Sequence, residues 1–271
     1  MSRLSIALPI VAAVLFAACG SAATPAPTDG PGATNGPGAT RAPGTTNAPG
    51  TTSAAGASQQ AGGSYDFTNA ATNLSVLDSY AFDVEIVSSN TTTTGVKAGT
   101  TSFTGVVNKK DGTQSMDMLT KDGKGNVTDE TAFVITSTKS YMKSGAAGKW
   151  AEIPAAQVST FTAAFGAFRP EQLFSIYFLS AATNNSKIGD ETKNGVATTH
   201  YRGGDAVGAI MSGLTGVSAN WQSDVWVARD KGYLVHSEAG AQGANPSSAG
   251  SFSVTVDITK INGNNPVTAP I

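Results

Sequence analysis

The chain has 271 residues, a formal net charge of -2, 13% charged residues and a single cysteine. A chain this close to neutrality lacks the positive charge of an electrostatic nucleic-acid binder, and one cysteine excludes an internal disulfide and a cysteine-rich zinc site. The charged fraction is about half that of typical globular domains, and small residues take its place. This composition indicates a secreted protein or a low-complexity segment, and the chain shows signs of both.

The N-terminus has the pattern of an export signal. Arg3 precedes an apolar stretch from Leu4 to Phe16, and two alanines and Cys19 follow. The stretch is shorter than the roughly 20 apolar residues of a membrane-spanning helix, so it predicts a secretory signal. Small residues before a lone cysteine resemble the lipobox of bacterial lipoproteins, a family in which the chain is cut before a lipid-modified cysteine. The resemblance implies a signal peptide over residues 1–18 and lipidation of Cys19; the alternative is an ordinary signal peptide cut elsewhere.

Residues 19–63 are predicted to be the lipidated cysteine followed by a disordered tether. The only charges after Cys19 are Asp29 and Arg41, and a hexapeptide repeat runs from PGATNG (Pro31–Gly36) to PGTTSA (Pro49–Ala54). The Pro-Gly steps oppose a helix and the segment offers nothing apolar to bury. Such a tether holds a folded domain away from the membrane to which Cys19 anchors the chain.

From Ser64 onward the composition predicts one folded domain over residues 64–271, long enough to bury a core. Apolar residues at helical spacing predict a helix over Asp66–Ser79, and strict alternation predicts a strand over Tyr80–Val87. Similar patterns predict four further strands, at Thr101–Asn108, Thr113–Thr120, Thr131–Thr136 and Lys139–Lys143.

The middle of this domain departs from the strand pattern. Residues 155–183 are rich in aromatic side chains and long enough for two helices, the second beginning at Pro170. Strands resume afterwards, with one short helical patch at Ala206–Leu214 between them. The predicted strands are Glu191–Tyr201, Asn220–Ala228, Tyr233–Glu238 and Ser251–Lys260.

These elements predict an α+β fold. Alternating strands leave one sheet face solvated, and helices grouped in separate runs cover the other face. We therefore expect a single curved antiparallel sheet of about 8–10 strands, with helices covering its concave face.

The order of the elements also resembles a known family, the mycobacterial LppX/LprG-type lipoproteins, within the wider fold of the LolA and LolB lipoprotein carriers. The resemblance rests on the lipobox and on a set of segments spread along the domain, namely Leu77–Phe82, Phe103–Val107, Tyr141-Met142, Asp190–Tyr201, Asp224–Val227, Gly232–Leu234 and Phe252–Ile261. It implies a half-barrel sheet whose concave side faces helices and encloses a hydrophobic cavity for acyl chains or lipidated molecules. The family has no catalytic motif, so no functional residue carries over by motif.

The candidate site is therefore apolar. Methionine adapts to irregular surfaces, and apolar clefts with few polar groups suit acyl chains. We expect the cavity and its movable cover to be formed by Met116, Met118, Phe161, Phe165, Phe168, Leu173, Phe174, Ile176, Tyr177 and Phe178. The alternative is that the same residues form an ordinary dry core.

No pattern in the chain indicates an enzyme, a metal site or a cofactor. His200 and His236 lie in predicted strands, and no nucleophile elbow, phosphate-binding loop or zinc-protease motif is present. Asp122–Asn126 lacks the further acids of a calcium loop and predicts a turn, and Asp190-Glu191 predicts the solvated start of a strand.

The sequence thus predicts a membrane-anchored, extracytoplasmic lipoprotein, a monomer that binds or carries a lipid or lipidated ligand. Its partners are that ligand and, through the acyl anchor, the membrane; no nucleic acid is expected. The alternative is a non-enzymatic interaction or scaffold protein of the cell envelope with the same fold and a filled core. An enzyme, the third hypothesis, needs His200 or His236 beside a nucleophile and an acid.

Overall fold

The computed structural model describes residues 68–89, 98–178, 185–203, 220–242 and 251–271, all within one compact unit, Ser53–Ile271. Cys19, the signal peptide, the tether and the helical patch at 206–214 lie outside these residues. The elements are α2 (Thr68–Thr72), the 3-10 helix η1 (Asn73–Val76), β1 (Ser79–Ser89), β2 (Gly99–Asn108), β3 (Thr113–Asp122), β4 (Val127–Ile135), β5 (Ser140–Ser144), β6 (Ala151–Glu152), α3 (Ala155–Gly166), α4 (Pro170–Tyr177), β7 (Asn185–Lys193), β8 (Val196–Gly203), β9 (Asn220–Ala228), β10 (Leu234–Gln242) and β11 (Ser251–Thr259).

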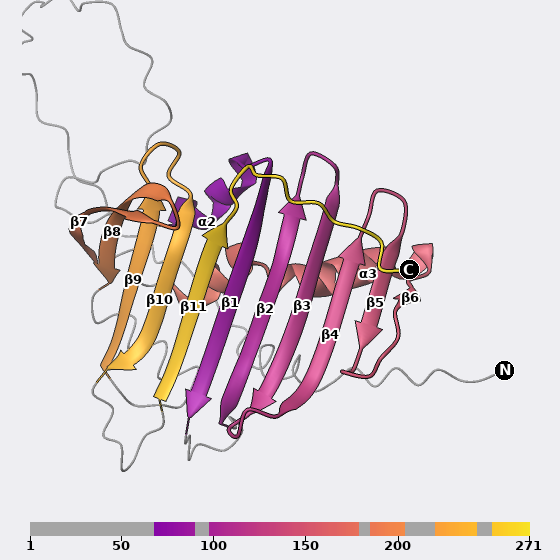
Figure 1. The fold of residues 1–271 in the computed structure, drawn as a ribbon. Helices are drawn as coiled ribbons and strands as arrows, with labels where there is room; N and C mark the ends of the chain where they lie inside the picture. The colour runs from indigo at the N-terminus through magenta and orange to yellow at the C-terminus, as the bar shows by residue number, and fades with distance from the viewer. Residues whose placement is uncertain (1–67, 90–97, 179–184, 204–219, 243–250) are drawn as a thin grey trace, which may run out of the picture. The chain divides into compact units, whose positions relative to one another are not determined.

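The described strands form one open antiparallel sheet in the order β6-β5-β4-β3-β2-β1-β11-β10-β9-β8-β7 (Figure 1). The first and last strands pair at its centre, with Ala81 opposite Thr259. The sheet therefore has two halves: β2–β6 follow β1 on one side, and β7–β10 precede β11 on the other. The predicted antiparallel α+β fold is confirmed, but the described sheet has eleven strands, more than the predicted 8–10.

The extra strands have local causes. The predicted single strand over Glu191–Tyr201 is wrong, because the chain reverses at Asn194 and Gly195, where φ is 51° and 78°. Positive φ at two successive residues is the geometry of a tight hairpin turn, for which Asn-Gly is the preferred pair. The strand β6 has only two residues, too few for any alternation to predict it. The opening helix is also shorter than expected, since η1 ends at Val76 and β1 begins at Ser79.

One face of the sheet is buried and the other is more exposed, as alternation predicts. In β11, the inward residues Phe252, Val254, Val256 and Ile258 are all buried, whereas the four residues beginning with Ser253 that alternate with them are half-buried. The hydrophobic core therefore lies entirely on one side of this strand.

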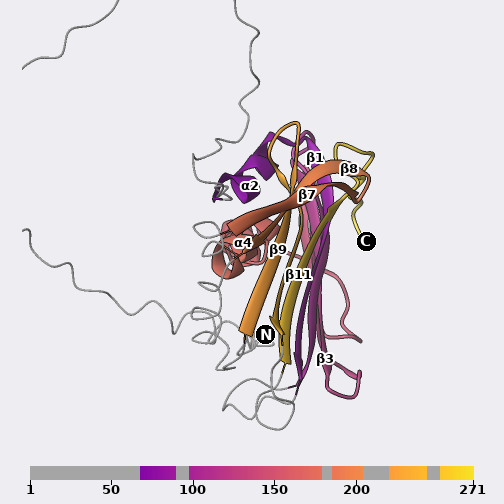
Figure 2. The ribbon, with the colours of Figure 1, turned by 90° about the vertical axis from the view of Figure 1, so that its left-hand side faces the viewer.

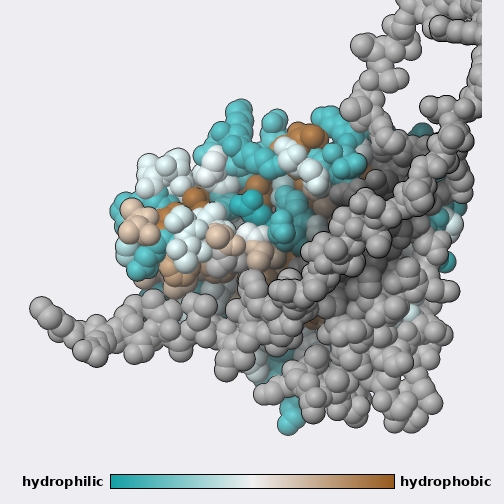
Figure 3. Space-filling view, turned by 180° about the vertical axis from the view of Figure 1, so that it is seen from behind, coloured by the Kyte–Doolittle hydropathy of each residue, from teal (hydrophilic) through white to brown (hydrophobic). Residues whose placement is uncertain are grey.

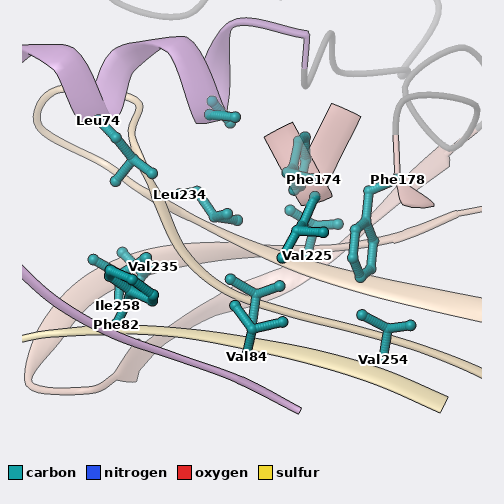
Figure 4. Close-up of a cluster of buried hydrophobic side chains, with 14 of the residues drawn as sticks. Leu74, Phe82, Val84, Phe174, Phe178, Val225, Leu234, Val235, Val254 and Ile258 are labelled. Carbon is teal, nitrogen blue, oxygen red and sulfur yellow. The ribbon is translucent and has the colours of Figure 1, made fainter. Parts of the chain in front are cut away.

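The helices lie on the buried side (Figure 2). There α2 contacts α4, and α4 contacts β11. Leu74 of η1 and Phe174 of α4 meet Val225, Leu234 and Val254 of the sheet in a closely packed cluster (Figure 4). No helix in the described part of the chain is long and apolar enough to cross a membrane.

Candidate functional site: the apolar interior and its polar rim

Part of the predicted site lies beneath α3. Met116 and Met118 point inward from β3, where they are 5% and 7% exposed. Phe165 of α3 stacks on Phe133 of β4, with ring centroids 4.6 Å apart. Phe168, just after α3, stacks on Phe103 of β2 at 5.0 Å. These six residues, Phe103, Met116, Met118, Phe133, Phe165 and Phe168, are called the α3 zone below.

The other predicted residues lie elsewhere. Leu173, Phe174 and Phe178 are fully buried against the centre of the sheet, where the rings of Phe174 and Phe178 stack at 5.3 Å (Figure 4). Phe161 lies in α3 and is half-buried. The side chains of Ile176 and Tyr177 lie outside the described part. The structure thus divides the predicted site between the α3 zone and a tighter core under α4.

The α3 zone is the less tightly closed of the two. Phe165 and Phe168 are only half-buried, although the sheet residues beneath them are buried. A cavity of about 10 Å³ lies here, lined by Phe82, Val107, Gln114, Ser115, Met116, Phe133, Phe165, Gly166 and Arg169. A space of that size holds about one water molecule. This cavity is therefore too small to hold an acyl chain in the closed arrangement.

Polar side chains gather beside this cavity. Arg169 lies between α3 and α4, and its Nη2 donates to Oε1 of Gln114 in β3. The Tyr80 hydroxyl donates to Oε1 of Glu171 at 2.6 Å, and Lys109 Nζ lies 5.6 Å from the centre of the Tyr80 ring. We call these five residues, Tyr80, Lys109, Gln114, Arg169 and Glu171, the polar rim.

The electrostatics of the polar rim follow from burial. Burial, followed by the neighbouring Glu171 carboxylate, raises the pKa of Tyr80 well above its usual range. Burial also lowers the pKa of Lys109. The second carboxylate oxygen of Glu171, Oε2, is buried without a hydrogen-bond partner among the described residues. One acceptor of the polar rim is therefore unsatisfied, which is costly in a buried position.

The polar rim is not among the residues predicted from the sequence, although the sequence holds a signal for it. Arg169 and Glu171 are the only charged residues between Glu152 and Lys187. Two charges alone in a long apolar stretch mark a place where the stretch meets water or a polar group. Their partners, Gln114 and Tyr80, come from strands far away in the sequence.

An open pocket of about 520 Å³ lies on the surface next to the polar rim, lined by Ala163, Gly166, Ala167, Arg169, Glu171 and Gln172. Gly166 and Arg169 line both this pocket and the internal cavity. The short segment that joins α3 to α4 thus separates the interior from the surface. Seen from the side opposite to Figure 1, the described surface mixes hydrophilic with apolar residues (Figure 3).

The two histidines lie on the outer face of the sheet, around Trp226. The His200 ring stacks on the indole with 4.1 Å between centroids, and the His236 ring meets it edge-on at 4.8 Å. His200 Nε2 lies 2.7 Å from Oδ1 of Asp224, and its Nδ1 lies 3.2 Å from Oε1 of Glu191. Both ring nitrogens therefore face carboxylates and not the hydroxyl group that nucleophilic catalysis requires.

His236 has the same arrangement. Its Nδ1 lies 2.7 Å from Oδ1 of Asp257, and its Nε2 lies 2.6 Å from Oε1 of Glu238. Burial raises the pKa of Asp257, but hydrogen bonds from His236 and Asn194 outweigh burial and lower it overall. The cluster links β7 to β11 across the outer face. Within the described ranges, no group of three or more His, Cys, Asp or Glu side chains is placed to hold a metal ion.

The acidic segments behave as ordinary turns and strands. Asp122 Oδ1 accepts from the backbone N–H of Asn126 at 2.9 Å, which closes the predicted turn. Asp190 pairs with Lys187 at 2.8 Å, while Glu191 accepts from the Trp226 indole. The two neighbouring carboxylates therefore have separate partners.

No protein-family model matches the chain, and no curated protein matches it. Similar solved structures include the Mycobacterium tuberculosis lipoprotein LppX, at 16% identity over 75% of this chain and 96% of that chain, with a TM-score of 0.41. LprF from Mycobacterium bovis has 15% identity over 75% of this chain and 94% of that chain, with a TM-score of 0.40. A LolA superfamily protein from Nitrosomonas europaea has 10% identity, coverage of 70% and 88%, and a TM-score of 0.24. The chain is thus similar to LppX-type lipoproteins and a LolA superfamily protein, as the sequence predicts, and this likeness concerns the fold alone.

Proposed function

We propose that the protein binds a lipid between the sheet and α3, with α3 as a movable cover over the concave face of a half-barrel. The observation that carries this proposal is the α3 zone. The contacts that join α3 to the sheet there are ring stacks between apolar side chains, Phe165 on Phe133 and Phe168 on Phe103. Such an interface accepts an acyl chain in place of the helix without leaving a polar group unpaired.

The energies favour this exchange. Separating two aromatic pairs costs about 0.5–1.5 kcal/mol each beyond burial, and exposing each ring costs about 1.5–3 kcal/mol. An acyl chain gains about 0.8 kcal/mol for each methylene removed from water, so roughly a dozen methylenes offset both costs. The small volume of the closed cavity is therefore compatible with a site that opens as the ligand enters.

The location follows from the N-terminal sequence. We propose that Cys19 carries the lipid anchor, that residues 20–63 are a disordered tether, and that residues 64–271 act as a monomer on the extracytoplasmic face of the cell membrane. Two or three acyl chains suffice for stable anchoring, whereas one chain binds only reversibly. The tether then lets the lipid-binding domain reach both the membrane and a partner.

Native mass spectrometry tests the proposal. The full chain with Cys19→Ala, which carries no anchor, is incubated with vesicles of a bacterial membrane lipid extract. One bound lipid per chain is the expected result. Phe165→Gln places an amide in the acyl path and is expected to weaken binding about tenfold. Val127→Gln, at a 46% exposed position of β4, is the matched control and leaves binding unchanged.

The packed interior favours a second candidate, an interaction or scaffold protein of the cell envelope with a filled core. The observation behind it is the cavity of about 10 Å³ beneath α3. The same experiment separates the two candidates. A chain mass that is unchanged after incubation with the lipid extract contradicts the lipid-binding proposal and leaves the second candidate.

A further inference from the structure

We propose that the bound lipid has an anionic head group and that Arg169 binds this group at the mouth of the site. The inference rests on the proposed function, because it concerns the ligand of the same site. The first observation is the position of Arg169. Since Gly166 and Arg169 line both the internal cavity and the open surface pocket, a lipid whose chain lies beneath α3 passes this segment on its way out. Its head group then lies in the surface pocket, next to the Arg169 guanidinium.

The charges of the polar rim favour an anion. Within the described residues, Arg169 donates to the neutral amide of Gln114 and not to a carboxylate. A guanidinium has five N–H donors, and their planar arrangement matches the oxygens of a phosphate or carboxylate. One bond to Gln114 leaves most of these donors for a ligand.

Lys109 adds a second positive charge. Its Nζ donates to the backbone carbonyl of Leu74, which is neutral. Burial is the main cause that lowers the pKa of Lys109, and the Glu171 carboxylate opposes it. The positive charge of Arg169 lowers this pKa further. The two cations are therefore close enough to repel each other. A bound anion relieves that repulsion, and the single carboxylate of Glu171 does not neutralise both.

Glu171 indicates a further property of the head group. One of its oxygens accepts from Tyr80, and the other, Oε2, is buried without a partner among the described residues. A carboxylate oxygen accepts hydrogen bonds only, so this atom requires a donor. A hydroxyl on the head group supplies one. The inferred ligand is thus a lipid whose head group combines a phosphate with a hydroxyl.

Two matched probes test the inference on the full chain with Cys19→Ala. Dioleoyl-phosphatidylglycerol carries a phosphate and hydroxyls, while dioleoylglycerol has the same acyl chains without the phosphate. We expect Arg169→Gln to weaken binding of the anionic probe about tenfold, as loss of charge-assisted hydrogen bonds does, and binding of the neutral probe by less than twofold. Arg169→Lys, which keeps the charge, restores part of the loss. Lys110→Gln, at an exposed position next to the polar rim, is the control and changes neither affinity.

Each other outcome has a distinct meaning. Equal losses for both probes in Arg169→Gln indicate that Arg169 only holds the helices in place, and they overturn the inference. Displacement of the anionic probe by millimolar inorganic phosphate assigns the site to a free anion and also overturns it. If the unmodified site binds neither probe, the proposed lipid binding itself fails. The melting temperature of Arg169→Gln, measured in parallel, separates loss of binding from loss of folding.

Discussion

Gly105 shows how closely the inner face of the sheet is packed. It lies in β2 opposite Phe82 of β1, and a Cβ added there lies 2.6 Å from the Phe82 ring and also meets the backbone oxygen of Ser115. The neighbouring cavity of about 10 Å³ is too small to receive a displaced ring. Gly105→Ala is therefore expected to lower the free energy of unfolding by about 1–3 kcal/mol, measured by urea denaturation. Gly189→Ala, where an added Cβ meets nothing within 4 Å, is the control, and equal stability of the two variants contradicts the argument.

Asp83 is a residue whose charge opposes folding. Burial, followed by the charges of Asp257 and Glu85, raises its pKa. The folded chain thus holds this proton more tightly than the unfolded chain, so ionised Asp83 costs stability at neutral pH, and the cost vanishes as the pH falls below about 3.9. Because Asp83 is only partly buried and solvent screens its charge, Asp83→Asn is expected to add only a few tenths of a kcal/mol at pH 7, and nothing at pH 3. Urea titrations at both pH values measure this, and an equal gain at both assigns the effect to packing.

At the scale of elements, alternation predicts strands well and their partners poorly. The predicted strands over Tyr80–Val87 and Ser251–Lys260 match β1 and β11 within two residues at each end, because one face of each is buried along most of its length. That these two strands pair depends on contacts across most of the chain, which no local pattern contains. The hairpin at Asn194-Gly195 is different, since its turn residues are a local signal that the alternation around it obscured.

In the candidate site, too, the sequence predicts the local elements but not their contacts with distant parts of the chain. The aromatic spacing of α3 predicts that Phe165 and Phe168 lie on one side of a helix, and both rings do face the sheet. Which rings they meet depends on the order of β2, β3 and β4. The bond between Arg169 and Gln114 spans 55 residues and exists only because the sheet brings β3 under the α3–α4 joint. The apolar half of the site is therefore predictable from the sequence, and the polar rim is not.

At the scale of the whole folded unit, the interior differs between the two halves of the sheet. Under α4, Leu173, Phe174 and Phe178 are at most 1% exposed, whereas the aromatic rings that α3 offers are half-buried. The helices also differ at their ends. α4 begins with Pro170 at its first position and has Glu171 in its first turn, whereas α3 has no acid in its first turn; neither helix has a side-chain cap or a base in its last turn. An acid in the first turn stabilises a helix by about 0.3–1 kcal/mol, so α3, which also packs less tightly on the sheet, is the weaker element.

Hydrogen exchange in the lipid-free chain measures this difference. Amides open locally at a free energy set by the apolar contacts that opening breaks, from near zero up to the global value. We expect the amides of the last two turns of α3 to exchange at least tenfold faster than those of β11, whose inward side chains Val254, Val256 and Ile258 are fully buried and report global unfolding. The later amides of α4 are expected to exchange as slowly as those of β11. If α3 is instead protected as strongly as β11, it leaves the sheet only when the whole domain unfolds, and an acyl chain then has no route beneath it.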